Sequence, residues 1–330
     1  MIIIHRFCEA SGPGVSGFER HVLRQGEVIP ADTLWIDLIE PTREEDLLVE
    51  AHLGISVPTR EEMGDIEPSE LLYQEDGARY MTARFAHNVQ VEPETSGITF
   101  ILKDKTLVSV RYVEPKAFQI FANRLSKPGG CRPNAESVLA GLFDTVIDRA
   151  ADILQGTAAK IDAISRRVFQ DHTDAGGRNA EYQEILRSLG RHGDLISKIR
   201  ESLVSVERVL LFLSASYRAE HVAKELREEV RSTLRDLQSL EEHATFQAQK
   251  IQFLLDATLG LVNLEQNNII KLFSVMAVIF MPPTLIASIY GMNFKNMPEL
   301  DTWWGYPSAL VMMLCAAVFP YLFFRWKKWL

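Results

Sequence analysis

Small, polar and flexible side chains recur on one face of an otherwise apolar segment near the end of this 330-residue chain. They are spaced by steps of three and four, which places them on one side of a helix. The set comprises Asn267, Ile270, Ser274, Ala277, Met281, Thr284 and Ser288, with Phe273 close to it. Such a face is either the packing surface of a membrane helix or the wall of a pore. Asn267 at one end and Asn293 beyond the other favour the pore.

Residue patterns that carry catalysis are absent from the sequence. It has no phosphate-binding loop, no G-x-G-x-x-G, no H-E-x-x-H and no nucleophile elbow, and its eight histidines are scattered. The three cysteines, Cys8, Cys131 and Cys315, form no metal-binding or disulfide pattern. We therefore expect a protein that is not an enzyme, in a reducing compartment.

Two long apolar segments must position the polar face. Residues 272–290 and 302–324 carry no charged side chain, and about 20 residues span the hydrocarbon core of a bilayer. We expect membrane spans at about 269–290 and 306–325, joined by an external loop at 291–305. Trp303 and Trp304 mark one interface, and Trp326 and Trp329 mark the other. The basic end "RWKKWL" predicts that both termini are cytoplasmic.

The region before the first span predicts one very long helix. No proline occurs from about Tyr217 until Pro282, and apolar residues keep a spacing of three and four. We expect a helix of roughly 70 residues that continues through the bilayer and is kinked at Pro282 and Pro283. Two spans cannot enclose a path for ions, so a transporter of this kind must assemble from several copies.

The N-terminal part predicts a cytoplasmic α/β domain at 1–135, followed by a helical region at 136–268 that includes the start of the long helix. Four short segments rich in β-branched and aromatic residues, at 33–40, 78–91, 97–104 and 106–113, are typical of strands. Thr42 and Glu45 predict a capping box for a helix that ends near Gly54. Residues 172–181 are expected to form a loop between two long helices.

Charge is distributed unevenly along the chain. The formal net charge is −9, and of the 44 acidic residues only Glu299 and Asp301 come after residue 270. An acidic N-terminal region gathers cations and repels nucleic acid, so we expect no nucleic-acid partner.

The motifs around the two apolar segments resemble the CorA family of magnesium channels. Gly291-Met292-Asn293 follows the first span, "MPEL" occupies 297–300, and "FMPPTLIASIYGMNF", "WGYP" and "WIDLIEPT" are also similar to the family. The resemblance implies a funnel-shaped homopentamer with an α/β cytoplasmic domain, a long stalk helix that lines the pore, and the second span outside it. It implies a channel for Mg²⁺, and for Co²⁺ or Ni²⁺, in the cell inner membrane, in contact with lipid.

The resemblance also assigns roles to residues. Gly291, Met292 and Asn293 would form the selectivity filter, with Glu299 in the external loop, and the pore would be lined by Asn267, Ile270, Phe273, Ala277, Met281, Thr284 and Ser288. Intracellular Mg²⁺ would act as regulator as well as substrate by binding between subunits. Asp256 is the first candidate for that site because it precedes Asn267 by three helical turns; Asp236 is the second, with Glu92 or Glu94 as partners. A solvated helix charge is the alternative for each.

Two further functions fit the architecture. A ZntB-like zinc transporter shares it, although the chain keeps the GMN and MPEL motifs and has no His or Cys cluster suited to zinc. A non-conducting, membrane-anchored interaction protein would leave the polar face and the double proline unexplained. The chain departs from the family in the external loop, at the outer end of the expected pore. Lys295 stands there where an acidic residue is common in the family, which weakens the expected attraction of cations.

Overall fold

The structure is a computed structural model that describes residues 1–8, 17–65, 67–127, 129–170, 178–219, 223–292 and 302–327. Its strands are β1 (Ile2–Cys8), β2 (Gly17–Val22), β3 (Thr33–Ile39), β4 (Leu72–Glu75), β5 (Ala78–His87), β6 (Glu94–Lys103) and β7 (Thr106–Arg111). Its helices are α1 (Arg43–Leu53), the 3-10 helix η1 (Glu62–Gly64), α2 (Pro68–Leu71), α3 (Lys116–Leu125), α4 (Ala135–Phe169), α5 (Arg178–Ala219), α6 (Lys224–Tyr290) and α7 (Gly305–Trp326). The chain divides into two compact units, Met1–Gly176 with Gln183–Leu255, and Gly177–Tyr182 with Asp256–Leu330.

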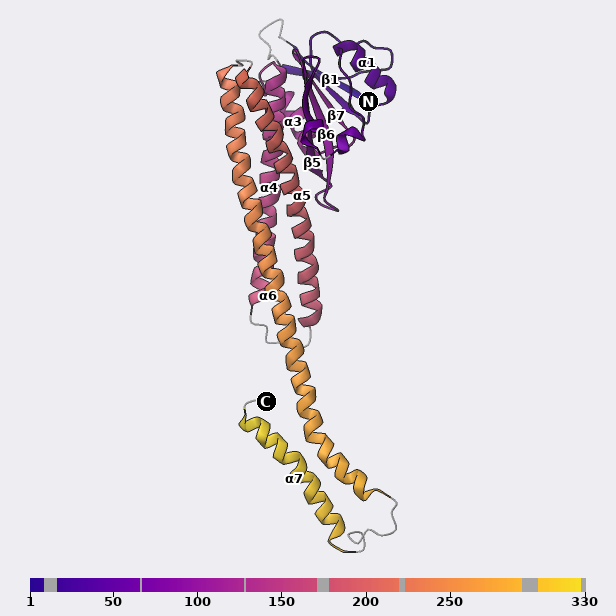
Figure 1. The fold of residues 1–330 in the computed structure, drawn as a ribbon, viewed down its shortest axis with the longest axis vertical. Helices are drawn as coiled ribbons and strands as arrows, with labels where there is room; N and C mark the ends of the chain where they lie inside the picture. The colour runs from indigo at the N-terminus through magenta and orange to yellow at the C-terminus, as the bar shows by residue number, and fades with distance from the viewer. Residues whose placement is uncertain are drawn as a thin grey trace. The chain divides into compact units, whose positions relative to one another are not determined.

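The strands form one sheet in the order β2-β1-β3-β7-β6-β5-β4 (Figure 1). β3 and β7 are parallel neighbours, whereas the other neighbouring strands are antiparallel. The α/β class predicted for the N-terminal part is confirmed, and β3, β5, β6 and β7 lie where strands were expected. Strands β1, β2 and β4 and helix α3 were not predicted.

The sheet is covered on both faces, which its alternating side chains require. Ile36 and Leu38 of β3 belong to an apolar cluster that also contains Val49 of α1 and Met63 of η1. Trp35 of the same strand points to the opposite face, where its ring centroid lies 6.4 Å from that of Phe118 on α3. Phe85, Phe100 and Phe143 extend this second, aromatic core from the sheet to α4.

Helix α1 begins and ends where its sequence predicts. The Thr42 side chain accepts a hydrogen bond from the Glu45 N–H, and the Glu45 carboxylate accepts one from the Thr42 N–H. Gly54 closes the helix in the left-handed conformation, with φ of 63°, which a residue with a Cβ adopts at a cost.

A buried ion pair joins β3 to β7. The Arg111 guanidinium donates to both carboxylate oxygens of Asp37, at 3.0 and 2.9 Å, and Ser109 Oγ donates to Asp37 at 2.7 Å. Trp35 Nε1 donates to Ser109 Oγ at 2.9 Å, so the network continues to the aromatic core. Because each charged group has several partners, the pair satisfies the condition under which buried charges are tolerated.

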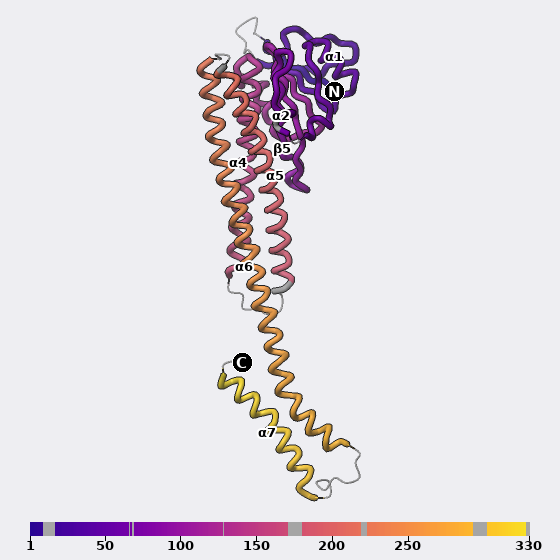
Figure 2. The backbone as a smooth tube through the Cα atoms, in the orientation of Figure 1, coloured from indigo at the N-terminus to yellow at the C-terminus, as the bar shows by residue number. Residues whose placement is uncertain are grey.

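Three long helices lie side by side next to the sheet (Figure 2): α4, α5 and the part of α6 in the first unit. Their contact faces are apolar, as the three-and-four spacing predicts. Gln247 of α6 donates to the Leu154 carbonyl of α4 at 3.0 Å, and Lys250 forms an ion pair with Asp162. The predicted loop at 172–181 is wrong at its end, because α5 already begins at Arg178.

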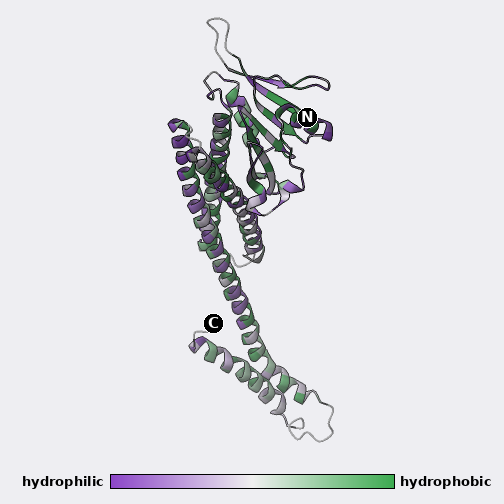
Figure 3. Ribbon diagram, turned by 45° about the horizontal axis from the view of Figure 1, so that its top comes forward, coloured by the Kyte–Doolittle hydropathy of each residue, from purple (hydrophilic) through white to green (hydrophobic). Residues whose placement is uncertain are grey.

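Helix α6 is continuous over 67 residues, which confirms the prediction of one helix of roughly 70. It begins at Lys224, since Tyr217 still belongs to α5. Pro282 and Pro283 lie inside it and remove two backbone donors from its last third. Figure 3 shows that the last turns of α6 and most of α7 are hydrophobic. Both helices are long and apolar enough to cross a membrane.

Acidification should destabilise the sheet through His5. This side chain is 3% exposed and stacks on Trp35 with 4.3 Å between ring centroids. Burial lowers the pKa of His5 from 6.5 to about 4 in the folded chain, so the unfolded chain binds the proton more tightly. Stability is therefore full above pH 6.5 and falls by about 3 kcal/mol as the pH drops through 4.

Thermal unfolding of the full chain in detergent, measured between pH 7.5 and pH 4.5, tests this effect. The melting temperature should fall more steeply for the wild type than for His5→Phe, which keeps a ring against Trp35 and cannot titrate. Parallel curves for the two proteins would show that His5 does not control the acid sensitivity.

Candidate ion-permeation site

The residues predicted to line a pore lie on one exposed face of α6. Among them Met281 is 68% exposed, Phe273 61% and Ile270 55% in the single chain. Asn267, Ala277, Thr284 and Ser288 are exposed as well. Apolar side chains this exposed require a further cover, which lipid or other copies of the chain can provide.

The opposite face of the same helix is partly covered within the chain. Val275 is buried, and the half-buried side chains that follow it continue one stripe: Ile279, Pro282, Pro283, Ile286 and Tyr290. At about 100° per residue, this stripe lies roughly half a turn away from Ile270, Met281 and Ser288. Helix α7 turns back beside this part of α6 (Figure 1) and presents Gly305 and Ala309 as its buried residues. α7 therefore leaves the candidate pore face uncovered.

Two hydroxyl groups on the candidate pore face are oriented by their own helix. Thr284 Oγ1 donates to the Phe280 carbonyl at 2.7 Å, and Ser288 Oγ donates to the Thr284 carbonyl at 2.8 Å. With the proton engaged in this way, the lone pairs of each oxygen remain available to accept hydrogen bonds. Water molecules around a cation point their hydrogens outward, so these oxygens can contact a hydrated ion without displacing its water.

A side chain larger than hydrogen would fit tightly at the end of α6. The Gly291 N–H donates to the Ala287 carbonyl at 2.9 Å, and a Cβ at Gly291 would lie 3.1 Å from that same oxygen. Met292, the next residue, is 46% exposed. Asn293 and Glu299, the other predicted residues of the filter and loop, lie outside the described residues. A side chain at 291 would therefore crowd the last turn of α6.

The four candidate regulatory acids form no metal-binding group within the described part of one chain. Asp256 and Asp236 are exposed on α6. Asp256 lies 34 residues before the helix ends at Tyr290, and Asp236 lies 20 residues earlier still. Glu92 and Glu94 are exposed near the start of β6, where the Glu94 carboxylate lies 3.8 Å from His87 Nε2. The described residues contain no group of three or more His, Cys, Asp or Glu side chains that could hold a metal ion. A site between subunits stays a prediction.

Comparison with known proteins assigns the chain to a family. The model of the CorA-like Mg²⁺ transporter proteins matches residues 30–328, nearly the whole chain. This chain belongs to the CorA-like Mg²⁺ transporter family. It is 37% identical over 300 residues to the magnesium transport protein CorA of Salmonella typhimurium, which covers 91% of this chain and 92% of that protein.

Solved structures show the CorA fold along the whole chain. The complete CorA magnesium transporter from Methanocaldococcus jannaschii matches with a TM-score of 0.75 at 19% identity, covering 100% of this chain and 99% of that one. The cytoplasmic domain of ZntB from Vibrio parahaemolyticus matches with a TM-score of 0.51 at 12% identity, covering 79% of this chain and 98% of that one. Because both kinds of protein share the fold, the fold alone does not select the ion.

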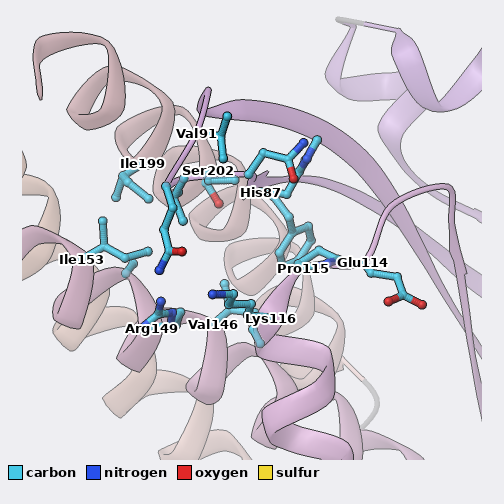
Figure 4. A pocket seen from close by; sticks show the side chains of 17 residues that line it. His87, Val91, Glu114, Pro115, Lys116, Val146, Arg149, Ile153, Ile199 and Ser202 are labelled. Atoms are coloured by element: carbon cyan, nitrogen blue, oxygen red, sulfur yellow. The ribbon is translucent and has the colours of Figure 1, made fainter. Parts of the chain in front are cut away.

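One feature of this CorA-family chain was not found by sequence reasoning. A cavity lies between the end of β5 and helices α4 and α5, with Arg149 and Lys116 among its lining residues (Figure 4). Its side chains come from separate segments of the chain, none of which carries a recognisable motif. Periodicity could identify their helices but not their meeting point.

Proposed function

We propose that this chain assembles as a homopentamer that conducts Mg²⁺ into the cytoplasm through a pore lined by α6. The observation that carries the proposal is the two-sided character of this helix. Its partly covered face is roughly half a turn from the exposed face that bears Met281, Thr284 and Ser288. In a ring of copies the uncovered face turns to the axis while α7 lies outside. Membership of the CorA-like Mg²⁺ transporter family supports the same arrangement.

The proposed filter is a ring of Asn293 side chains at the outer mouth, shaped by Gly291 and Met292. Mg²⁺ requires near-ideal octahedral geometry and loses its water reluctantly. Amide oxygens can accept hydrogen bonds from the intact hydration shell, whereas a ring of carboxylates would hold the ion more strongly. Conduction needs binding that is weak enough to release the ion. Glu299 would concentrate cations near the entrance, opposed by Lys295.

Apolar rings provide the proposed closure of the pore. Ile270, Phe273 and Met281 are large, exposed and apolar on the pore face. A narrow ring of such side chains can exclude water and so block a hydrated ion. Small residues between them, such as Ala277, leave wider segments. Co²⁺ and Ni²⁺, which resemble Mg²⁺ in size, would pass by the same route.

The proposed location is the cell inner membrane, with both termini in the cytoplasm and α6 and α7 in contact with lipid. The two candidate spans support this proposal, since two crossings joined by one connection would leave both ends of the chain on the same side. Arg325 and Lys327 at the end of α7 favour the cytoplasmic side. Mg²⁺ would then be the transported substrate and, bound between the cytoplasmic regions of neighbouring copies, a regulator.

Ion flux into liposomes that hold the purified full chain tests the function. We expect Mg²⁺ to enter and internal Mg²⁺ to suppress its entry, with Co²⁺ and Ni²⁺ measured in parallel. Zn²⁺ is the competing substrate, since a ZntB-like transporter would carry it. Entry of Zn²⁺ without Mg²⁺ would refute the proposal, and flux of neither ion would favour a membrane-anchored interaction protein.

Replacing Asp256 with Lys should change how internal Mg²⁺ closes the channel. The substitution removes a carboxylate from the proposed intersubunit site and adds a positive charge that repels Mg²⁺. We expect the internal Mg²⁺ concentration for half-inhibition of flux to shift severalfold, with the filter unaffected.

The control is Glu228→Lys, which makes the same change of charge at an exposed position of the same helix far from Asp256. Its inhibition curve should match the wild type. If Asp256→Lys also matches the wild type, Asp256 is not a sensor, and Asp236 with Glu92 or Glu94 becomes the next pair to test.

A further inference from the structure

A cavity of about 220 Å³ lies between the sheet and the helices next to it, in the first unit of the chain. Its lining comes from the end of β5 with the turn that follows, the connection from β7 to α3, the first residues of α3, and one face each of α4 and α5. Five segments thus meet at one place, as Figure 4 shows. The cavity is remote in sequence from the residues proposed to conduct ions.

The floor of this cavity is apolar and formed by core residues. Phe85, Val146, Ala150 and Ile199 line it and are each less than 9% exposed. An apolar cavity of about 150 Å³ is large enough to bind a benzene ring. The space therefore suits a compact apolar group of about one aromatic ring, at the small end of the range for ligand pockets.

Two positive side chains stand above this floor. Figure 4 shows the nitrogen-bearing ends of Arg149 and Lys116 on the same side of the cavity, turned toward each other. Glu114 also lines the cavity, but its carboxylate points away from them and accepts a hydrogen bond from Gln119 at 3.3 Å. Like charges that face each other beside an apolar surface repel, and an anion between them would remove the repulsion.

Existing partners do not neutralise the two cations. Arg149 forms an ion pair with Asp152 at 3.8 Å, but the Asp152 side chain is 70% exposed and lies outside the cavity lining. Such surface pairs contribute little. Lys116 forms no ion pair with any residue in the described part of the chain. His87 Nε2, at the rim, is already 2.8 Å from Ser96 Oγ.

We propose that this cavity binds a small organic carboxylate with an apolar body of about one ring. The body would occupy the floor formed by Phe85, Val146, Ala150 and Ile199. The carboxylate would accept hydrogen bonds from the Arg149 guanidinium, whose planar fork matches it, and from the Lys116 ammonium. A bound molecule would touch the sheet, α3, α4 and α5 together. It would therefore stabilise this unit independently of ion conduction.

The test uses 4-fluorobenzoate as the probe and the full-length protein in a nonionic detergent. Titration is followed by ¹⁹F NMR, in which the signal of the probe broadens on binding. We expect a Kd on the order of 1 mM, as a ligand of about ten heavy atoms allows. The neutral analogue 4-fluorobenzyl alcohol should bind at least about tenfold more weakly, because each 1.4 kcal/mol lost is tenfold in Kd. Equal affinities would refute a role for the cations.

Three variants locate the site. Arg149→Gln and Lys116→Gln should each weaken binding severalfold, and Ala150→Phe should abolish it by filling the floor. Arg191→Gln is the matched control, an exposed arginine on α5 outside the cavity lining, and should bind like the wild type. Lys116 is exposed at the first position of α3, so its replacement tests the proposal even if a variant in the middle of a helix folds poorly. Unchanged binding by Ala150→Phe or by Lys116→Gln would overturn it.

Discussion

Mg²⁺ uptake should fall to background when Asn293 is replaced by Ala. In the proposed pentamer the change removes an amide from each of five subunits at the outer mouth, and a methyl group cannot accept hydrogen bonds from the hydration shell. A hydrated Mg²⁺ then meets a ring without the side-chain oxygens that accept hydrogen bonds from its water, and it has no favourable site at which to enter. The measurement is the initial rate of Mg²⁺ entry into liposomes, with equal amounts of variant and wild-type protein.

The matched control is Asn296→Ala, which removes the same side chain three residues further along the same connection. It should keep most of the uptake, because the proposed filter uses only Asn293. Size-exclusion chromatography of both variants should show the assembly of the wild type. Uptake that persists in Asn293→Ala, or is lost equally in Asn296→Ala, would contradict a filter built on Asn293.

Local signals predicted much of the fold because they depend on neighbouring residues alone. Thr42, Glu45 and Gly54 define the two ends of α1 by hydrogen bonds and backbone conformation that operate within a few residues. The absence of proline and the regular apolar spacing predicted α6 over nearly its whole length. Membrane helices add a further local signal, the length of an uncharged run.

Elements that depend on distant partners were missed for a physical reason. β1 has an apolar run at Ile2–Ile4, but its strand character comes from pairing with β2 and β3. β4 is four residues long and pairs only with β5. Such short segments are strands because the sheet provides their hydrogen bonds, and the sequence of each alone favours no single conformation.

The same distinction between local signals and distant contacts applies to the candidate site. The pore face could be predicted because one helix carries it, so a spacing of three and four is enough to group Asn267, Met281 and Ser288. Which face α7 covers could not be predicted, since it depends on how two helices pack. The regulatory acids are harder still, because a site between copies of the chain requires the geometry of the assembly. The cavity beside Arg149 shows the same dependence within one copy.

Bulk added at Ala277 should block the channel, because this small side chain lies between larger ones on the proposed pore face. In Ala277→Phe, five aromatic rings would project into a pore already narrowed by Phe273 and Met281. We expect Mg²⁺ flux to fall to background even when internal Mg²⁺ is absent, so the loss reflects obstruction and not closure by the regulator. Substitution by Ser, which keeps the volume small, should leave the flux near that of the wild type.

The control that decides the orientation of α6 is Ala287→Phe. It makes the same change on the same helix, also at an exposed alanine, but about 80° around the helix axis from Ala277. If α6 presents the predicted face to the axis, this variant should conduct. A block at 287 with normal flux at 277 would mean that the helix is rotated in the assembly. The pore would then be lined by the neighbouring stripe, and the roles proposed for Met281, Thr284 and Ser288 would be wrong.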